Sequence, residues 1–514
     1  MASTFGIFEA AKSGLNSAME HMRITGHNIA NANTVGYTRQ RVVASAKESH
    51  ADYLLRPIVN DTVGQGVEVL QIQQLRSAYL DNQYRDLNAG YSYSDHATQA
   101  LTYLEGLFNA ELNEGEGLTG AIEGFFSALN TFSSDTTSEE NRITVQKTAL
   151  GLTQSFQLVY DEMRALWHDQ NDSVGTVSQE INATAVKLTE LNKAIERYER
   201  SGQAANDLRD ERNLLLDKLS GYVNITYENN SASPSMVDVK IGGIDLVTGG
   251  SCAAIELRSD SSHAAEINAL TADIAATNGA IMAALAMDPA ADTSALLAQL
   301  DGYVTALEAY VPVDTAADAD GVIQVSYEGA GLVSGANAVD IERAVEDNLS
   351  AWTAFHRNTL SLGGSELSAS TGGVRGGALY AHMEMISSLD PATPGIPYYM
   401  DKLNALARNI AKGINDIHLS GYSYDTDPSE AATTSRDGIY FFHVETDLDG
   451  SGAVTAEHYD RVTAGNFSLG GDIIDSIWNI AGSSAQVSSH GGEMASGNGE
   501  VANRMFRDLA GGGY

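Results

Sequence analysis

A heptad rhythm at the start of the chain most constrains what this protein can fold into. Apolar and small side chains recur there every three or four residues, and the stripe continues one heptad later: Phe8, Ala11, Leu15, Ala18, Met22 and Ile29. Such spacing is typical of a helix that packs along another helix. It also fits an ordinary amphipathic helix of a globular domain, so both interpretations stay open at this point.

An asparagine-rich segment comes directly after this helix. Asn28, Asn31 and Asn33 stand at i, i+3 and i+5, and their side chains compete with the helix for backbone hydrogen bonds. Residues 34–37 predict a turn, and the alternating residues of 64–72 predict a strand. We interpret the segment as a device that sets the angle between the helix and the next part of the chain. Local turn capping is the simpler interpretation and is compatible with it.

Long helical patterns occupy much of the remaining chain. Residues 78–108, 174–198 and 397–419 carry apolar side chains at helical spacing, and residues 206–220 form a shorter helical pattern. Long helices joined by short connections build bundles. Alternating residues between 222 and 241 predict strands instead.

The middle of the chain is acidic and differs in composition. Residues 259–342 contain 13 Asp and Glu and no Lys or Arg. Two helical stripes lie on either side of Asp288-Pro289, where proline interrupts a helix, and they predict a helical hairpin near 264–311. Strand-like residues resume at Ile323. The acidic run is either a solvated outer surface or a cation-binding or adhesive face.

These patterns predict a multidomain α+β protein. N-terminal and returning helices would form an elongated helical bundle, and an inserted β-rich middle domain would carry the hairpin. The expected division is a terminal helix with the asparagine-rich motif (1–45), a helical bundle domain (46–220, completed by 372–420 and 471–510), an inserted acidic domain (221–371) and a small loop and strand insertion (421–470).

Composition excludes several classes of function. Lys and Arg number 30 against 67 Asp and Glu, a net charge of −37, which argues against binding to nucleic acids or to anionic membranes. The single cysteine, Cys252, excludes an intrachain disulfide and a cysteine-rich zinc module, and we expect it to be a small buried residue. No stretch approaches the roughly 18 apolar residues of a membrane span. The first 23 residues include Glu9 and Glu20 and lack the pattern of a cleaved secretory signal.

Two short motifs could carry chemistry. Residues 115–120 match GxGxxG, but the acidic run before them would repel a pyrophosphate, and we expect a loop that begins a helix. The second motif resembles a calcium loop, although its twelfth position is His458 where a bidentate Glu is needed. Its candidate ligands, which fit a turn between strands equally well, are Asp447, Asp449, Ser451 and Thr455.

Signatures of catalysis are missing from the sequence. It has no H-E-x-x-H, no G-x-S-x-G and no P-loop. We therefore expect no enzymatic activity and no cofactor, although a triad can assemble from residues that are distant in sequence.

The segment from Asn28 to Tyr37 resembles the signature shared by flagellar rod, hook and hook-associated proteins. Further stretches are similar, within that group, to the FlgK family of hook-associated proteins: residues 117–129 with 142–156, residues 181–220, and residues 403–418 with Phe441-Phe442. The resemblance covers about residues 1–250 and 372–510.

The resemblance implies a structural protein that joins the hook to the filament of the bacterial flagellum. Family members assemble as a ring of about eleven copies around a central channel. The implied partners are other copies, the hook protein, a second FlgL-like junction protein and an export chaperone that binds a C-terminal segment. Export through the flagellar type III route would deliver the protein outside the cell without a cleaved signal.

The resemblance also assigns roles to residues. Phe8, Leu15 and Met22 would face an inner coiled-coil layer. The angle between this layer and the next would depend on Asn28, Asn31, Asn33, Gly36 and Tyr37.

One departure from the family affects these expectations. FlgK proteins carry a long C-terminal heptad helix that pairs with the N-terminal helix, whereas this sequence reaches residues 511–514 without one. We therefore expect an exposed stripe, on a helix that is disordered or packed against something else. The alternatives are another flagellar axial protein (hook or distal rod), which the 174–220 helix pair disfavours, and an extracellular ion-binding or adhesive module that uses the acidic domain.

Overall fold

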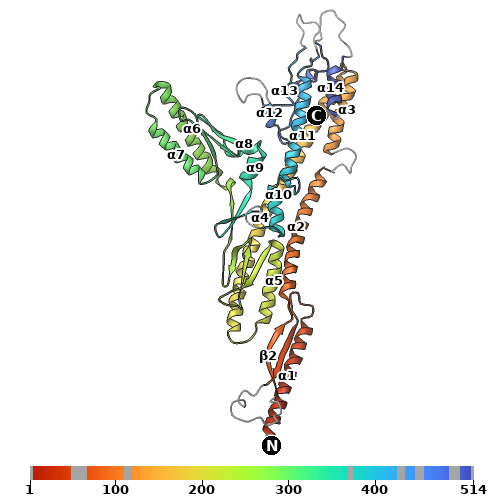
Figure 1. Cartoon of the computed structure of the whole chain (residues 1–514). Coiled ribbons are helices and arrows are strands. Elements are labelled where there is room, and N and C mark those ends of the chain that lie inside the picture. The colour runs from red at the N-terminus through yellow and green to blue at the C-terminus, as the bar shows by residue number, and fades with distance from the viewer. Residues whose placement is uncertain are drawn as a thin grey trace, which may run out of the picture. The chain divides into compact units, whose positions relative to one another are not determined.

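The computed structural model describes residues 4–47, 66–108, 117–368, 374–424, 435–445, 456–485 and 498–510 (Figure 1). They form a multidomain α+β protein, mainly helical, with small antiparallel sheets inserted in the middle, as the sequence predicted. The chain divides into two compact units, each assembled from three stretches of sequence. The first unit holds residues 1–96, 173–257 and 359–381, and the second holds residues 97–172, 258–358 and 382–514.

The first unit begins with an N-terminal arm, which we define as residues 4–47 and 66–76. The arm consists of α1 (Thr4–Ala30) and the antiparallel pair β1 (Gln40–Ala46) and β2 (Val67–Gln74). One face of α1 lies against this pair, where Ile24 and Val42 are buried. The helix is therefore ordered through a face other than its heptad stripe.

The rest of the first unit combines helices with a four-stranded sheet. It comprises the first part of α2 (Ala78–Phe108), the second half of α4 (Glu139–Glu199), α5 (Asn206–Tyr222), β3 (Ile225–Asn229), β4 (Val237–Ile241), β5 (Ile244–Thr248), β6 (Ser251–Cys252), most of β7 (Ile255–Ser259), β12 (Asn358–Leu362), β13 (Ser365–Leu367) and the start of α10 (Gly377–Ser387).

The second unit holds most of the remaining helices and a second four-stranded sheet. It comprises α3 (Leu118–Ser134), the first half of α4, η2 (Asp260–His263), α6 (Ala264–Met287), α7 (Ser294–Glu308), β8 (Asp314–Ala317), β9 (Ile323–Tyr327), β10 (Ala330–Ser334), β11 (Asn337–Ala338), α8 (Ile341–Glu346), α9 (Leu349–His356), α11 (Ile396–His418), α12 (Ala456–Asp460), α13 (Gly471–Asp475), η3 (Ile477–Asn479) and α14 (Glu500–Ala510).

Helix α4 is longer than the range predicted for it. The sequence predicted a helix over 174–198, and the structure has one continuous helix of 61 residues. No proline lies between residues 139 and 199, and Gly151 has open space around it, so nothing interrupts the hydrogen bonding.

The sheets are small; three of them follow chain order, and in the fourth β12 pairs with the distant β7. Their strand orders are β1-β2, β3-β4-β5-β6, β11-β10-β9-β8 and β13-β12-β7. Cys252 lies on β6, a two-residue strand at an edge, and its side chain is exposed. The expectation of a buried cysteine was wrong, because Cys252 lies on a two-residue edge strand that no described part of the chain covers.

The helical hairpin expected in the acidic region is formed by α6 and α7, which lie side by side (Figure 1). Asp260–Met287 is long and apolar enough to cross a membrane by length and composition, and it contains an 18-residue window with a mean hydropathy of 1.3. The sequence predicted no such stretch; alanines raise the mean although Glu266 and Asp273 interrupt the run. Ile267, Ile274 and Ile281 are fully buried, which is typical of a helix in a protein core.

Two polar side chains on α11 anchor loops of the second unit. Asn415 Oδ1 accepts hydrogen bonds from the amides of Phe441 and Phe442, both at 2.9 Å. His418 Nδ1 donates to the Ile439 carbonyl at 2.7 Å, and its Nε2 accepts from the Ala481 amide at 2.8 Å. These hydrogen bonds hold the Phe441-Phe442 pair against the helix that contains residues 403–418.

Arg142 is a buried cation that carbonyls and aromatic rings surround, and it makes no ion pair with a carboxylate of the described residues. Its guanidinium donates to the carbonyls of Thr136 (2.9 Å) and Ile480 (2.6 Å), and lies over the rings of Phe132 (5.0 Å) and Trp478 (5.4 Å). Burial lowers the pKa of Arg142 to about 10. Carbonyl dipoles and ring faces replace the water that the charge loses.

Candidate functional site

Helix α1 presents an uncovered apolar stripe. Phe8, Leu15 and Met22 are 68%, 62% and 67% exposed, and Met19 and Ile29 are also exposed. A contiguous exposed apolar patch is a mark of an interaction surface. The stripe therefore leaves one face of α1 available to another helix, while the other face holds β1 and β2.

The asparagine-rich motif forms a polar knot between the end of α1 and the start of β1. Asn28 Oδ1 accepts from the Tyr37 hydroxyl (2.7 Å) and the Gln40 amide (2.9 Å), and its Nδ2 donates to the Gln40 carbonyl (2.8 Å). Because Tyr37 donates to Asn28, it accepts from His27 Nδ1 at 2.9 Å. The side chain of Asn28 thus pairs with the backbone of Gln40 as a neighbouring strand would.

The other motif residues act more locally. Asn31 Nδ2 donates to the His27 carbonyl at 3.1 Å, which caps the last turn of α1. Gly36 has a φ of +84°, and a Cβ there would lie 3.3 Å from the Cβ of Leu214 on α5. Asn33 is exposed, and no hydrogen bond from its side chain occurs within the described ranges. The structure thus brings four of the five motif residues into ordered contacts and leaves Asn33 at the surface.

Helix α5 receives the arm through two carboxylates. Asp210 Oδ2 accepts from the Thr38 amide (3.0 Å), and its Oδ1 accepts from Gln74 Nε2 (2.8 Å). Asp207 Oδ1 accepts from Gln40 Nε2 at 3.1 Å. These bonds tie both strands of the arm to one helix of the bundle, so the direction of the arm is fixed by named polar pairs.

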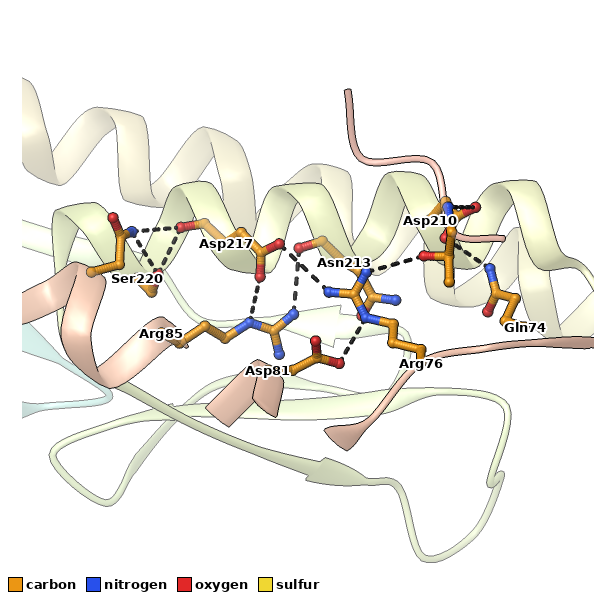
Figure 2. A network of polar contacts seen from close by, with 10 residues as sticks. Gln74, Arg76, Asp81, Arg85, Asp210, Asn213, Asp217 and Ser220 are labelled. Atoms are coloured by element: carbon orange, nitrogen blue, oxygen red, sulfur yellow. Dashed lines mark hydrogen bonds and ion pairs between the residues drawn. The ribbon is translucent and has the colours of Figure 1, made fainter. Parts of the chain in front are cut away.

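A second set of ion pairs continues along the same face of α5 (Figure 2). Arg85 Nε lies 2.7 Å from Asp217 Oδ1, and Arg76 lies 3.6 Å from Asp217 and 2.7 Å from Asp81. Arg85 is only 2% exposed and lies 4.4 Å over the ring of Tyr227. Asp217 is 23% exposed, so the pair is partly buried, and removal of Asp217 would leave the buried charge of Arg85 uncompensated.

Burial governs the electrostatics of this site. It raises the pKa of the Asp210 carboxyl, and the hydrogen bonds from Thr38 oppose that shift. The pKa of Tyr37 is raised by burial and by the nearby charges of Asp207 and Asp210. Tyr37 therefore stays protonated and keeps donating to Asn28 at neutral pH.

The sequence motif contains the residues of the knot, but it does not reveal that the arm is bonded to α5. Thr38 and Asp210 are 172 positions apart, and Gln74 and Asp210 are 136 apart, so no local pattern connects them. The charged residues around Asp210 are evident in the sequence, but the sequence does not show that Asp210 faces the arm. The calcium candidates at 447, 449, 451 and 455 lie outside the described residues, and among the described residues no group of three or more His, Cys, Asp or Glu could hold a metal ion.

Comparison with known protein families identifies the family of this chain. The model described as "Flagellar hook-associated protein FlgK helical domain" matches residues 101–265 and 258–431, which is more than half of the chain. This chain belongs to the FlgK family. A second model, "Flagella basal body rod protein", matches residues 8–38, the region of α1 and the knot.

Two relatives of this chain share one name. The chain is 30% identical to "Flagellar hook-associated protein 1" of Bacillus subtilis (strain 168) over 253 residues, which is 48% of each chain. It is 28% identical to the protein of that name from Salmonella typhimurium over 217 residues, 42% of this chain and 38% of the relative. The matched stretches thus span about half or less of the curated relatives' length.

A solved structure is similar at low identity. It is described as "The structure of the flagellar hook junction protein FlgK from Burkholderia pseudomallei" and has a TM-score of 0.41 at 16% identity, covering 71% of this chain and 47% of that chain.

Proposed function

We propose that this protein is a structural subunit that joins the hook to the filament of the bacterial flagellum. The proposal is supported by membership of the FlgK family and by the names of the relatives. The observation that carries it is an uncovered apolar stripe on α1, placed on an arm whose direction is fixed by the knot and by α5. Such an arm can enter a coaxial layer of helices without changing its own angle.

The stripe supplies enough apolar surface for helix pairing. Complete burial of a large apolar side chain contributes about 1.5–3 kcal/mol. Phe8, Leu15, Met19, Met22 and Ile29 are all mostly exposed in the isolated chain. Their burial against helices of neighbouring subunits would favour assembly, and the knot residues would keep successive subunits in one orientation.

The remaining parts of the proposal follow from the family. Copies would form a ring of about eleven around a channel, between the hook protein and a second FlgL-like junction protein. The chain would be exported unfolded by the flagellar type III route and function outside the cell. Its role would be assembly and not catalysis, and no cofactor is needed for it.

Deletion of the gene in the source bacterium tests this function. We expect hooks that lack filaments by electron microscopy, with flagellin released into the medium, and restoration by the intact gene. Normal filaments on the deletion strain would refute the proposal.

A pair of variants tests the stripe within the same strain. Leu15→Ser combined with Met22→Ser should abolish filaments, because it removes apolar surface without touching the face of α1 that holds the strands. Asn16→Ser is the matched control, since Asn16 is exposed on the same helix and stays polar. Normal filaments with the double variant would show that the stripe is not an assembly surface.

A further inference from the structure

In two parts of the chain, an asparagine side chain on a helix makes the same set of hydrogen bonds to the backbone. Asn192 on α4 donates to the carbonyls of residues 45 and 57 positions later, Val237 (2.8 Å) and Gly249 (2.6 Å). Asn278 on α6 donates to the carbonyls of residues 45 and 57 positions later, Ile323 (2.7 Å) and Gly335 (2.9 Å). In each case its Oδ1 accepts from the amide of the first of those residues, at 3.2 Å and 3.0 Å.

A second asparagine repeats the correspondence. Asn182 Oδ1 accepts from the amide of Ile255, 73 positions later, at 2.7 Å. Asn268 Oδ1 accepts from the amide of Ile341, also 73 positions later, at 2.9 Å. In each of two separate α+β modules, residues 181–255 and 267–341, two asparagines on the first helix therefore bond the backbone at equivalent positions.

The sheets of the two modules share one register. β4 and β5 pair as Ile241 with Ile244 and Val239 with Val247, with a bulge between. The strands 86 positions later pair at the equivalent residues, Tyr327 with Ala330 and Val325 with Val333, again with a bulge between. The short fourth strands, β6 and β11, also pair at equivalent positions.

The tight turns that join β4 to β5 and β9 to β10 have the same backbone conformation. Gly242 and Gly243 have φ of +57° and +87°, and Glu328 and Gly329 at the equivalent positions have +47° and +82°. Among the described residues, Glu328 is the one non-glycine with positive φ. The strained turn has been kept where the residue type has changed, which indicates a shared ancestral backbone.

The second helices of the two modules, α5 and α7, are also equivalent, but their residues are 88 positions apart and not 86. Leu219 and Leu307, which end the buried stripes of α5 and α7, are 88 positions apart and both fully buried. Val223 and Val311, just before the next strand, are 88 apart and buried too. The loop before β4 is two residues longer than the loop before β9, which restores the spacing of 86.

One surface differs between the two modules. α5 carries a face of three acids (its acidic face), and α7 carries small uncharged residues at the equivalent positions, all exposed. The pairs are Asp207 with Ala295, Asp210 with Ala298, and Asp217 with Thr305. Since the second module folds with these replacements, its fold does not need the acids.

We infer that residues 181–255 and 267–341 are two copies of one module, and that the acidic face of α5, which the second copy lacks, holds the N-terminal arm. The acids of the first copy accept from Thr38, Gln40 and Gln74 of the arm. The part they play in the flagellum rests on the proposed function, whereas their hold on the arm does not.

The test replaces two acids by the residues of the second copy, Asp207→Ala and Asp210→Ala, and leaves the Asp217–Arg85 pair intact. Nitroxide labels are placed in the full chain at Ser45→Cys on β1 and Lys187→Cys on α4, with Cys252→Ser to remove the exposed native thiol. Pulsed electron paramagnetic resonance then measures the distance between arm and bundle. We expect one narrow distribution in the labelled parent and its loss in the double variant.

Glu211→Ala is the matched control, because Glu211 is an exposed acid on α5 for which no bond to the arm occurs within the described residues. It should keep the narrow distribution. Amide hydrogen exchange in β3–β6 should be unchanged in the double variant, as the second copy implies. A narrow distribution in the double variant, or unfolding of the β3–β6 sheet, would overturn the inference.

The two proposals fail in different experiments. In cells, the double variant should be exported and should fail to support filaments, while Glu211→Ala should support them. If deletion of the gene leaves filaments normal, the proposed function fails and the distance measurement still stands. If filaments require the gene and the distances do not change in the double variant, the inference fails alone.

Discussion

His418 provides a quantitative test of how the second unit is held together. Its neutral ring donates to Ile439 and accepts from Ala481, and a proton on Nε2 would remove that acceptor. Complete burial lowers the pKa of His418 to about 4, from an ordinary value of 6.5. Because the folded pKa lies below the unfolded pKa, this stabilisation is fully present above pH 6.5 and is lost as the pH falls through about 4.

The magnitude follows from linkage between protonation and folding. With these two pKa values, the free energy of unfolding should fall by about 2 kcal/mol between about pH 7.5 and about pH 5. The loss should reach about 3 kcal/mol once the pH is well below the folded pKa. At about pH 5 most carboxylates are still ionised, so the histidine contribution can be separated from general acid unfolding.

His418→Gln removes the titration and keeps a side chain that can hydrogen bond. The assay is urea unfolding of the full chain at both pH values, followed by hydrogen exchange in peptides that cover residues 439–444 and 477–483. The parent should lose about 2 kcal/mol more than the variant on acidification. His356, whose pKa burial also lowers to about 4, titrates in both proteins and cancels. An equal pH dependence in the two proteins would refute this reasoning.

Three further predictions concern single residues. Gly36→Ala should destabilise the first unit by about 1–2 kcal/mol because of its positive φ, whereas Gly90→Ala, in open space on α2, should stabilise it by about 0.5–1 kcal/mol; urea unfolding measures both. Asn192→Ala should cost about 2–4 kcal/mol, because it leaves buried backbone groups without partners, and Asn278→Ala should cost less, because its backbone partners are partly buried. Hydrogen exchange should rise only in the module that carries the change. Arg142→Met should cost about 2–4 kcal/mol and lower the melting temperature, because two buried carbonyls lose their donor.

The fold class could be predicted because the patterns that determine it are local. Helical spacing in 78–108 and 397–419 and alternation around 237–241 led to helices and strands at those places. The prediction of α4 covered only its second half, although the first half continues the same spacing, with Val145, Ala149 and Leu152 buried along one face. The exposure of Cys252 depends on the length of an edge strand, which side-chain type does not reveal.

The candidate site was predictable only in part. Asn28 and Tyr37 belong to one short motif, and their contacts join residues 9 positions apart. Asp207, Asp210 and Asp217 serve partners more than 130 positions away, so only the folded chain identifies them. The stripe of Phe8, Leu15 and Met22 was visible as a pattern, and its role in assembly stays a prediction.

The repeated module also creates a hazard during folding. Tandem copies with one strand register can exchange equivalent strands, and misassembly of this kind is characteristic of repeat proteins. Here β4 and β9 carry the same pairing positions, so each is in principle a substitute for the other. Divergence limits the exchange: Arg212 is buried and reaches Asn192 and Ser235 in the first copy, where the second copy has the buried apolar Leu300. If β9 took the place of β4, Arg212 on α5 would lose the carbonyl of Ser235, which lies just before β4, so this difference between the copies disfavours the exchange.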